Sequence, residues 1–426
     1  MDIESEGRKM VMKNKVSIVK VDESGIEAAI RKAIDLAGGL KKIVAPSSRV
    51  LIKPNVVSPE PSGTGCITDC RVTEAVTKVV QELGPKSVII GEGAGAGYDF
   101  IGSYSTEEAF RVSGTADVAY KLGVELRNLN TDEFEEVTVK NPYVMDKVRI
   151  AKTALESDVI IDIPVFKTHG RCLITLSLKN MKGVLPGAEK RKTHRLGLDK
   201  AIADLNSVVK VDFVIVDALT GMQGLWEYPK DSVELDLILA GADRVAVDTV
   251  GTYLMGFDPA RIMHLQYFAE RQGVKADLSQ VEVVGESLEE NRQSFSSSFE
   301  TFKSRFPMVS VFEGMSACTG CYGEFMGALI AIKGHSDGNA LDELIVVMGN
   351  PEPGDVKFTD RTLLLGKCPK KMANLGGTHI EGCPPMCDDI IRAICGMSGI
   401  DADIVIELRD QARQQMWEET KHLLEQ

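Results

Sequence analysis

Short apolar runs alternate with helical segments along the first half of the chain, and this alternation constrains the fold most strongly. Each run is followed by a segment with apolar residues at helical spacing and then by another run. That order is typical of parallel strands joined by helices that cover a sheet. We therefore predict an α/β fold whose N-terminal sheet is mixed or mostly parallel and flanked by helices. The expected strands are 16–21, 49–52, 87–90, 124–129, 158–164, 213–217, 235–240 and 281–284, and the helices are 24–36, 69–83, 106–113, 115–122 and 243–254.

The pattern changes after residue 285 and predicts a second, smaller unit. Residues 286–307 are polar and rich in serine, which favours a linker. We expect a flexible tail at 1–15, a large α/β domain at 16–285 and a smaller α/β domain at 308–426. The smaller domain is expected to have strands at 308–312, 344–348 and 362–365, helices through 325–332 and 388–395, and a closing helix at 403–424.

The overall charge excludes some classes of function. The chain has 426 residues, a formal net charge of −13 and a pI near 5.1, so general nucleic-acid binding is not expected. Neither a membrane-spanning run nor an apolar signal core is apparent in the sequence. Nine cysteines without a signal peptide favour metal binding or redox chemistry in the cytoplasm over a disulfide framework.

Four cysteines near the C-terminus predict one metal centre. They occur in Ala-Cys-Thr-Gly-Cys, Leu-Gly-Lys-Cys-Pro and Glu-Gly-Cys-Pro-Pro. Four thiolates from three loops are the ligands of one 4Fe–4S cluster, whereas zinc favours paired short-spaced cysteines and only one Cys-x-x-Cys occurs here. Zinc and simple buried thiols are the alternatives, and Cys387 and Cys395 are interpreted as structural. The predicted metal ligands are Cys318, Cys321, Cys368 and Cys383.

These motifs resemble the proximal-cluster domain of the nickel–iron hydrogenase small subunit and the related cluster subunit of respiratory complex I. The resemblance covers residues 308–395. It implies a flavodoxin-like domain that holds one 4Fe–4S cluster through the four cysteines. It does not imply hydrogen chemistry, because a fold does not determine the reaction.

A basic stretch lies within the acidic N-terminal domain. Residues 167–195 contain eight Lys or Arg residues and two of the six histidines. Such a concentration favours an anionic small molecule held by charge-assisted hydrogen bonds, although a solvated basic loop is the commoner explanation. The predicted catalytic residues are His169, His194 and Lys179, and the predicted anion-binding residues are Lys53, Asn55, Lys167, Asn180, Lys182 and Arg195.

Three other features have both a functional and a structural interpretation. The glycine-rich run 91–97 follows a strand and either cradles an anion with its amides or forms a plain turn. Cys66 and Cys70 near a helix start are either a reactive pair with lowered thiol pKa values or ordinary small residues. Several aspartates either face the basic stretch or cap helices and pair with basic residues; they are Asp162, Asp204, Asp217, Asp243 and Asp248.

Residues 16–285 also resemble the domain-of-unknown-function family 362. The motifs that carry the resemblance include Lys-Pro-Asn, Lys-Thr-His, Ser-Leu-Lys-Asn-x-x-Gly and Pro-Gly-Ala-Glu-Lys. Members are often linked to iron–sulfur modules in anaerobic bacteria and archaea. The resemblance implies that one pocket contains Lys53, Asn55, Lys167, His169, Lys179, Asn180 and His194.

Together these features predict a cluster-dependent oxidoreductase that acts on an anionic small molecule. One alternative uses the cluster as a Lewis acid in dehydratase-type chemistry, for which three protein cysteines are expected instead of four. Another is a non-catalytic electron-transfer or cluster-transfer protein, marked by an exposed apolar patch beside the cysteines. A redox partner protein and a homodimer are the assemblies left open.

Overall fold

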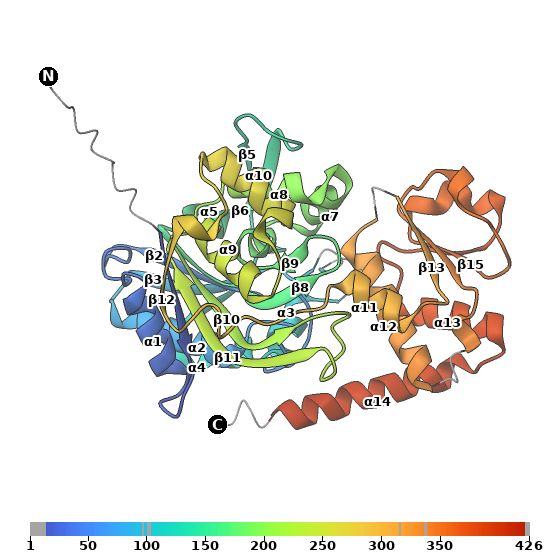
Figure 1. The fold of residues 1–426 in the computed structure, drawn as a ribbon, viewed down its shortest axis with the longest axis horizontal. Coiled ribbons are helices and arrows are strands. Elements are labelled where there is room, and N and C mark those ends of the chain that lie inside the picture. The colour runs from blue at the N-terminus through green and yellow to red at the C-terminus, as the bar shows by residue number, and fades with distance from the viewer. Residues whose placement is uncertain (1–13, 96–97, 100–103, 315–316, 336–338, 422–426) are drawn as a thin grey trace, which may run out of the picture.

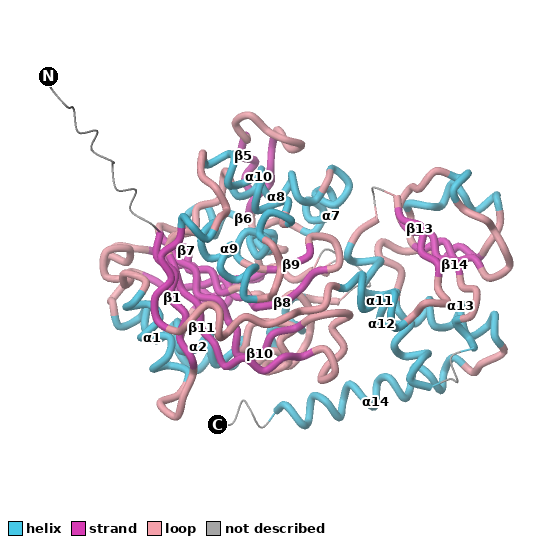
Figure 2. The backbone as a smooth tube through the Cα atoms, in the orientation of Figure 1, coloured by secondary structure: helices cyan, strands magenta, loops and turns pink. Residues whose placement is uncertain are grey.

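The computed structural model describes residues 14–95, 98–99, 104–314, 317–335 and 339–421 (Figure 1). Most of the expected N-terminal tail and the end of the expected closing helix lie outside these residues. The described chain forms a large α/β domain and a smaller one beside it (Figure 2).

Strands of the large domain lie in a ten-stranded sheet and a separate hairpin. Parallel pairing runs from β10 through β7, β2 and β3 to β4, whereas β11 is antiparallel to both β10 and β1. The prediction of a mixed or mostly parallel sheet is therefore confirmed. The strands are β1 (Asn14–Lys20), β2 (Arg49–Pro54), β3 (Ser87–Glu92), β4 (Glu125–Asn128), β5 (Phe134–Thr138), β6 (Lys147–Ala151), β7 (Val159–Ile163), β8 (Val165–His169), β9 (Leu173–Thr175), β10 (Phe213–Met222), β11 (Ser232–Gly241) and β12 (Val281–Gly285).

Helices cover both faces of the large sheet (Figure 1). On β10, Val214 packs into the core beneath α8, α9 and α10, while Ile215 packs into the core beneath α1, α2 and α4. Because side chains alternate along a strand, a strand buried on both faces reads as a continuous apolar run. The helices are α1 (Ile26–Leu36), α2 (Cys70–Glu82), α3 (Thr106–Val112), α4 (Thr115–Leu122), α5 (Lys152–Glu156), α6 (Ser177–Asn180), η1 (Met181–Val184), α7 (Gly187–Leu196), α8 (Leu198–Asn206), α9 (Arg244–Leu254), η2 (Pro259–Arg261), α10 (Met263–Gln272) and η3 (Leu278–Gln280).

The small domain has four parallel strands in the order β13-β14-β15-β16. The range expected to be a linker contains α11, whose Ser297 and Glu300 form a capping box and whose Phe302 is buried against the small domain. Its elements are α11 (Ser298–Arg305), β13 (Ser310–Glu313), α12 (Thr319–His335), η4 (Asn339–Leu341), β14 (Ile345–Met348), η5 (Pro353–Asp355), β15 (Thr362–Leu365), η6 (Cys368–Leu375), β16 (Thr378–Ile380), α13 (Cys387–Ser398) and α14 (Ala402–Lys421).

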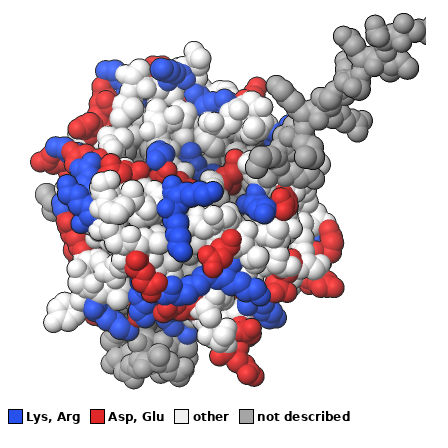
Figure 3. Space-filling view, turned by 90° about the vertical axis from the view of Figure 1, so that its left-hand side faces the viewer, with Lys and Arg blue, Asp and Glu red and all other residues white. Residues whose placement is uncertain are grey.

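Two surface properties agree with the composition. None of the helices in the described ranges combines the length and the apolar character needed to cross a membrane. On the face of the large domain shown in Figure 3, Lys and Arg side chains are interspersed with Asp and Glu side chains. The basic residues described there form no extended patch of one sign.

Candidate functional site

Five basic side chains from neighbouring segments form what we call the basic cluster. Repulsion shows that these side chains are close to one another. Lys179, Lys182 and His194 all lower the pKa of His169. Lys179 also lowers the pKa of Lys182, and both lysines lower the pKa of His194. The five side chains come from β8, α6, η1 and α7, which follow one another in the chain. The basic cluster comprises Lys167, His169, Lys179, Lys182 and His194.

Asp248 of α9 holds the short helix that presents Lys179. Its two carboxylate oxygens accept hydrogen bonds from the amides of Ser177 at 2.9 Å and Leu178 at 3.0 Å. A carboxylate at a helix N-terminus satisfies amides that have no partner within the helix. Asp248 therefore has a positioning role, which is the structural interpretation of this residue.

A buried polar network ties α6 to the large sheet. The Asn180 amide nitrogen donates to Asp162 at 2.7 Å, and its oxygen accepts from Lys53 at 2.9 Å and from Asn55 at 2.8 Å. The Lys53 ammonium is fully buried and also pairs with Glu92. The structure thus brings Lys53, Asn55 and Asn180 together, but Lys53 and Asn180 are engaged by protein partners.

His169 and Lys167 are buried at the end of β8. The His169 Nδ1 atom accepts the amides of Arg171 and Cys172, both at 3.1 Å, so only its Nε2 remains for a ligand. Burial, then repulsion by Lys179, holds the pKa of His169 well below its usual value, and the ring is neutral. The Lys167 ammonium donates to the Cys66 carbonyl and lies 4.5 Å from the centre of the Trp226 ring. Burial lowers the pKa of Lys167 to about 7.

Lys179, Lys182 and His194 form the more open part of the basic cluster. The Lys182 ammonium lies 2.9 Å from Nε2 of His194. Within the described chain, the Lys179 ammonium has neither an ion pair nor a hydrogen bond. Burial lowers the pKa of Lys179 to about 8, and burial with repulsion by Lys179 lowers the pKa of Lys182 further. Like charges buried together without a matching acid are costly, and a bound anion would relieve that cost.

The glycine-rich run after β3 is occupied by groups of the protein. The Lys190 ammonium donates to the carbonyls of Gly93 at 2.6 Å and Ala94 at 2.8 Å, and to Asn130 at 2.6 Å. The amides of Ala94 and Gly95 donate to Thr106 and to the Val57 carbonyl. In the described part of the run, carbonyl oxygens face a lysine and amides are already used, which favours the structural interpretation. Residues 96–97 lie outside the described residues.

The four cysteines predicted as metal ligands come together in the small domain. Cys321 hydrogen-bonds to the Cys318 sulfur and interacts electrostatically with Cys368 and Cys383. The hydrogen bond from Cys321, followed by the amides of Cys321 and Gly320, lowers the pKa of Cys318 to about 6 despite burial. Gly366 has a φ of +86°, and a Cβ built there would lie 3.1 Å from the Cys321 sulfur. Backbone therefore packs closely around the thiols.

The turn between β8 and β9 joins the basic cluster to the small domain. The Arg171 guanidinium pairs with Glu313 at the end of β13 at 2.6 Å, and Gly170 lies against the Tyr322 ring. Lys182 of the basic cluster interacts electrostatically with Cys318. The two predicted sites are thus neighbours within one chain.

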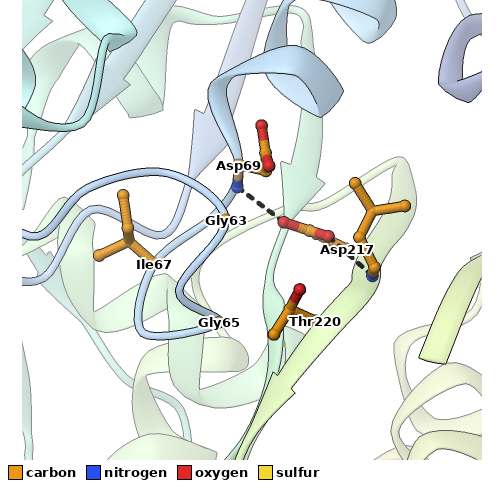
Figure 4. Close-up of a pocket in the computed structure, with 7 residues that line it drawn as sticks. Gly63, Gly65, Ile67, Asp69, Asp217 and Thr220 are labelled. Atoms are coloured by element: carbon orange, nitrogen blue, oxygen red, sulfur yellow. Dashed lines mark hydrogen bonds between the residues drawn. The ribbon is translucent and has the colours of Figure 1, made fainter. Parts of the chain in front are cut away.

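A separate pocket is lined by two carboxyl groups (Figure 4). Asp217 at β10 accepts the amides of Asp69 at 2.7 Å and Leu219 at 3.1 Å, while the Asp69 carboxylate caps α2 through the amide of Arg71. Burial and then the charge of Asp69 raise the pKa of Asp217 to about 7. Asp217 therefore faces the start of α2, and its carboxylate supports the α2 N-terminus.

The remaining predicted residues have structural environments. Arg195 is exposed in the last turn of α7. Burial raises the thiol pKa values of Cys66 and Cys70 to about 12, which favours the structural interpretation over a reactive pair. Asp243 caps α9 through the Ala246 amide at 2.8 Å. Asp204 accepts the amides of residues 143–145 and pairs with Arg271.

Sequence reasoning did not identify several residues around the site. Lys190 lies in the basic stretch but is not among the predicted site residues. Its ammonium binds the Gly93 carbonyl and so holds the end of β3. Trp226 covers Lys167 from a segment without a motif, and Arg171 reaches the small domain. Arg171 is one of the eight basic residues of the stretch 167–195, and no local pattern distinguishes it from the others.

Comparisons with known proteins bear on part of the chain. A thylakoid-associated protein of Synechocystis sp. is 27% identical over 241 residues, which are 55% of this chain and 71% of that protein. The lactate racemase apoprotein from Thermoanaerobacterium thermosaccharolyticum is 10% identical with a TM-score of 0.39, covering 90% of this chain and 91% of that one. A protein from Thermotoga maritima is 12% identical with a TM-score of 0.35, covering 78% and 74%. Residues 50–253, which hold the whole basic cluster, match the family described as Domain of unknown function (DUF362), and the first family resemblance is confirmed over that span.

Proposed function

We propose that this chain is an iron–sulfur oxidoreductase that acts on an anionic small molecule bound at the basic cluster. The observation that carries the proposal is the position of Lys182, which interacts electrostatically with Cys318 on one side and contacts His194 on the other. An electron-handling centre and an anion site are useful together only when they are close. Here one chain supplies residues for both.

The residues of the small domain fit a 4Fe–4S cluster. Cluster ligation requires thiolates, and the hydrogen bond between the two thiols lowers the pKa of Cys318 while it raises that of Cys321, so Cys318 is the thiolate of this pair. Cys318, Cys321, Cys368 and Cys383 would hold the cluster, which supplies single electrons when bound. Four converging cysteines support electron transfer over the Lewis-acid alternative, which leaves an iron position free of cysteine.

Residues of the basic cluster would bind the substrate and move a proton. Among the described residues Lys179 has neither an ion pair nor a hydrogen bond, and its charge would pair with the anionic group of the substrate. The Lys182 and His194 pair, 2.9 Å apart, would accept a proton from the reacting atom, since burial lowers both pKa values and favours the neutral, basic form of each group. His169 would donate through Nε2, because its Nδ1 is held by the turn.

The contacts of the β8–β9 turn count against a simple electron carrier. A carrier presents its cluster to a separate partner across an exposed surface. The Arg171–Glu313 pair and the Gly170–Tyr322 contact instead place the cluster residues against the basic cluster of the same chain.

Metal analysis of the anaerobically purified chain tests the cluster. We expect about four iron and four sulfide per chain and a visible absorbance that bleaches on reduction. Cys318→Ser should lose most of the iron and the colour. Cys395→Ser is the matched control, because Cys395 is fully buried in α13 and is not a predicted ligand.

A colourless, iron-free wild-type chain that is folded would contradict the proposal. The same conclusion would follow if Cys318→Ser retained the iron and bleached as the wild type does.

A further inference from the structure

A second group of metal-binding side chains lies outside the four cysteines. Cys172 belongs to the turn after β8, Asp199 to the first turn of α8, and His264 to the first turn of α10. One ligand atom from each residue lies within 4.8 Å of the other two. Thiolate, imidazole and carboxylate are the three ligand types that bind Zn²⁺.

The spacing of Asp199 and His264 fits a long hydrogen bond and also fits shared ligation of one cation. The His264 Nδ1 atom lies 3.3 Å from the Asp199 oxygen. This is longer than the usual N–H···O distance of about 2.9 Å. Tetrahedral zinc with bonds of about 2.0 to 2.3 Å separates neighbouring ligand atoms by about 3.3 to 3.8 Å.

His264 does not have the surroundings of a histidine that merely fills a core. Its side chain is 0% exposed, and its Nε2 has no hydrogen-bond partner among the described residues. A buried polar group normally has a partner, and among the described residues this ring has one hydrogen bond, the long one from Nδ1 to Asp199. The ring therefore lies at an incompletely satisfied site.

Cys172 is equally suited to a metal and poorly suited to free reactivity. Its side chain is 4% exposed, and its thiol hydrogen-bonds to Asp199 of the same group. A cation would replace the thiol proton, and the thiolate and the Asp199 carboxylate would balance the two charges of Zn²⁺. The Asp199 side chain is 31% exposed, which leaves one side of the site open to solvent.

We propose that Cys172, Asp199 and His264 bind one Zn²⁺-type cation with three protein ligands and an open fourth position. Three protein ligands with one open position are typical of catalytic zinc sites. The Cys172 amide contacts His169, and Cys172 interacts electrostatically with Lys179 and Lys182. The cation would therefore lie beside the basic cluster, and its open position would be available to an oxygen of the same anionic ligand.

Zinc analysis with X-ray absorption at the zinc edge tests the site in the full chain, because this edge does not report on iron. We expect about one zinc per chain after purification with zinc, with one sulfur at about 2.3 Å and the other ligands nitrogen or oxygen at about 2.0 to 2.2 Å. Cys172→Ser should lose the sulfur contribution. The matched control Cys70→Ser changes a thiol that is 5% exposed in the same domain and should keep it.

Three results would overturn the proposal, and they separate it from the proposed function. A folded, iron-containing chain without zinc removes the zinc site alone. Zinc surrounded only by sulfur places it at the four cysteines and removes both proposals. If Cys172→Ser does not fold, Asp199→Asn provides the test: zinc affinity, measured by competition with a chelating dye, should fall at least about ten-fold, and unchanged affinity overturns the site.

Discussion

Lys179 has a charge that the described protein leaves without a partner. Its ammonium is half-buried next to other basic groups, and the free protein bears the cost of that repulsion. Residues that bind a ligand in this way lower the stability of the unliganded fold, and ligand binding restores that stability.

We therefore predict opposite effects for Lys179→Met in the absence and presence of anions. The melting temperature of the free protein should stay the same or rise, by up to a few degrees, because a buried unpaired charge is removed. The rise in melting temperature that the wild type shows with inorganic phosphate or a small dicarboxylate should be reduced or lost.

Lys41→Met is the control for Lys179→Met, because Lys41 is exposed and distant in sequence from the basic stretch. Thermal unfolding with and without each anion provides the measurement. An undiminished anion effect in Lys179→Met would exclude Lys179 as an anion ligand.

For single residues, the sequence predicted which residues come together better than it predicted what each of them contacts. The basic stretch and the four cysteines were identified from motif and spacing, and the structure places their members together. Whether a residue faces a ligand or a protein partner depends on distant segments: Lys53 meets Glu92 and Asn180, and no local pattern contains that information.

Continuous apolar strands were predicted well, whereas a polar hairpin and two amphipathic helices were not. The runs that became β2, β7 and β10 are continuous and apolar because both faces of the large sheet are covered. The β5–β6 hairpin was missed because β5 is polar and has no buried side chain, although Val148 and Ile150 of β6 alternate with exposed residues. The helices α8 and α10 were missed as well, although their apolar residues pack beneath the sheet.

The contact between β10 and α2 predicts a pH dependence of stability. Asp217 has a folded-state pKa of about 7, above its unfolded value of about 3.9. The folded protein thus retains a proton that the unfolded chain releases, so this residue's contribution is complete below about pH 4 and is lost as the pH rises to about 7. Asp217→Asn should flatten the decline of unfolding free energy between pH 5 and 7 while lowering stability overall, because asparagine has one oxygen for the two amides of Asp69 and Leu219.

Urea unfolding across this pH range checks the Asp217 prediction. Asp22→Asn is the control, because a hydrogen bond from Ser24 lowers the pKa of the exposed Asp22 and places its titration below the range. A slope in Asp217→Asn as steep as in the wild type would show that other groups cause the decline.

On the scale of the whole molecule, the turn after β8 is one of several places where the two domains meet, because Arg305 of α11 also pairs with Glu227 and Asp231. The sequence predicted both domains as separate α/β units but contained no indication of how they meet, since Arg171 and Glu313 are 142 residues apart in the chain. Such contacts arise only when two folded surfaces come together. Such contacts matter because they fix where the two domains lie relative to each other, and they add little to the stability of the fold.

We predict that charge reversal at this contact loosens it without unfolding the protein. Glu313→Arg places a like charge opposite Arg171, and hydrogen exchange should rise in peptides 165–175 and 310–325. Global stability should change by about 1 kcal/mol or less, because both side chains are about 30% exposed.

The exchanged pair Arg171→Glu with Glu313→Arg should restore slow exchange in both peptides. Hydrogen exchange followed by mass spectrometry makes the comparison. Wild-type exchange in Glu313→Arg would show that the ion pair does not hold the two domains together.

The turn that follows β8 also determines where this protein tolerates inserted residues. In four consecutive residues, His169 serves the basic cluster, Gly170 and Arg171 meet the small domain, and Cys172 faces Asp199 and His264. A single inserted residue would shift every side chain after it, and neighbouring positions on a strand point to opposite faces. Length at this turn is therefore expected to be less variable than side-chain identity, and loops elsewhere are the safer places for tags or insertions.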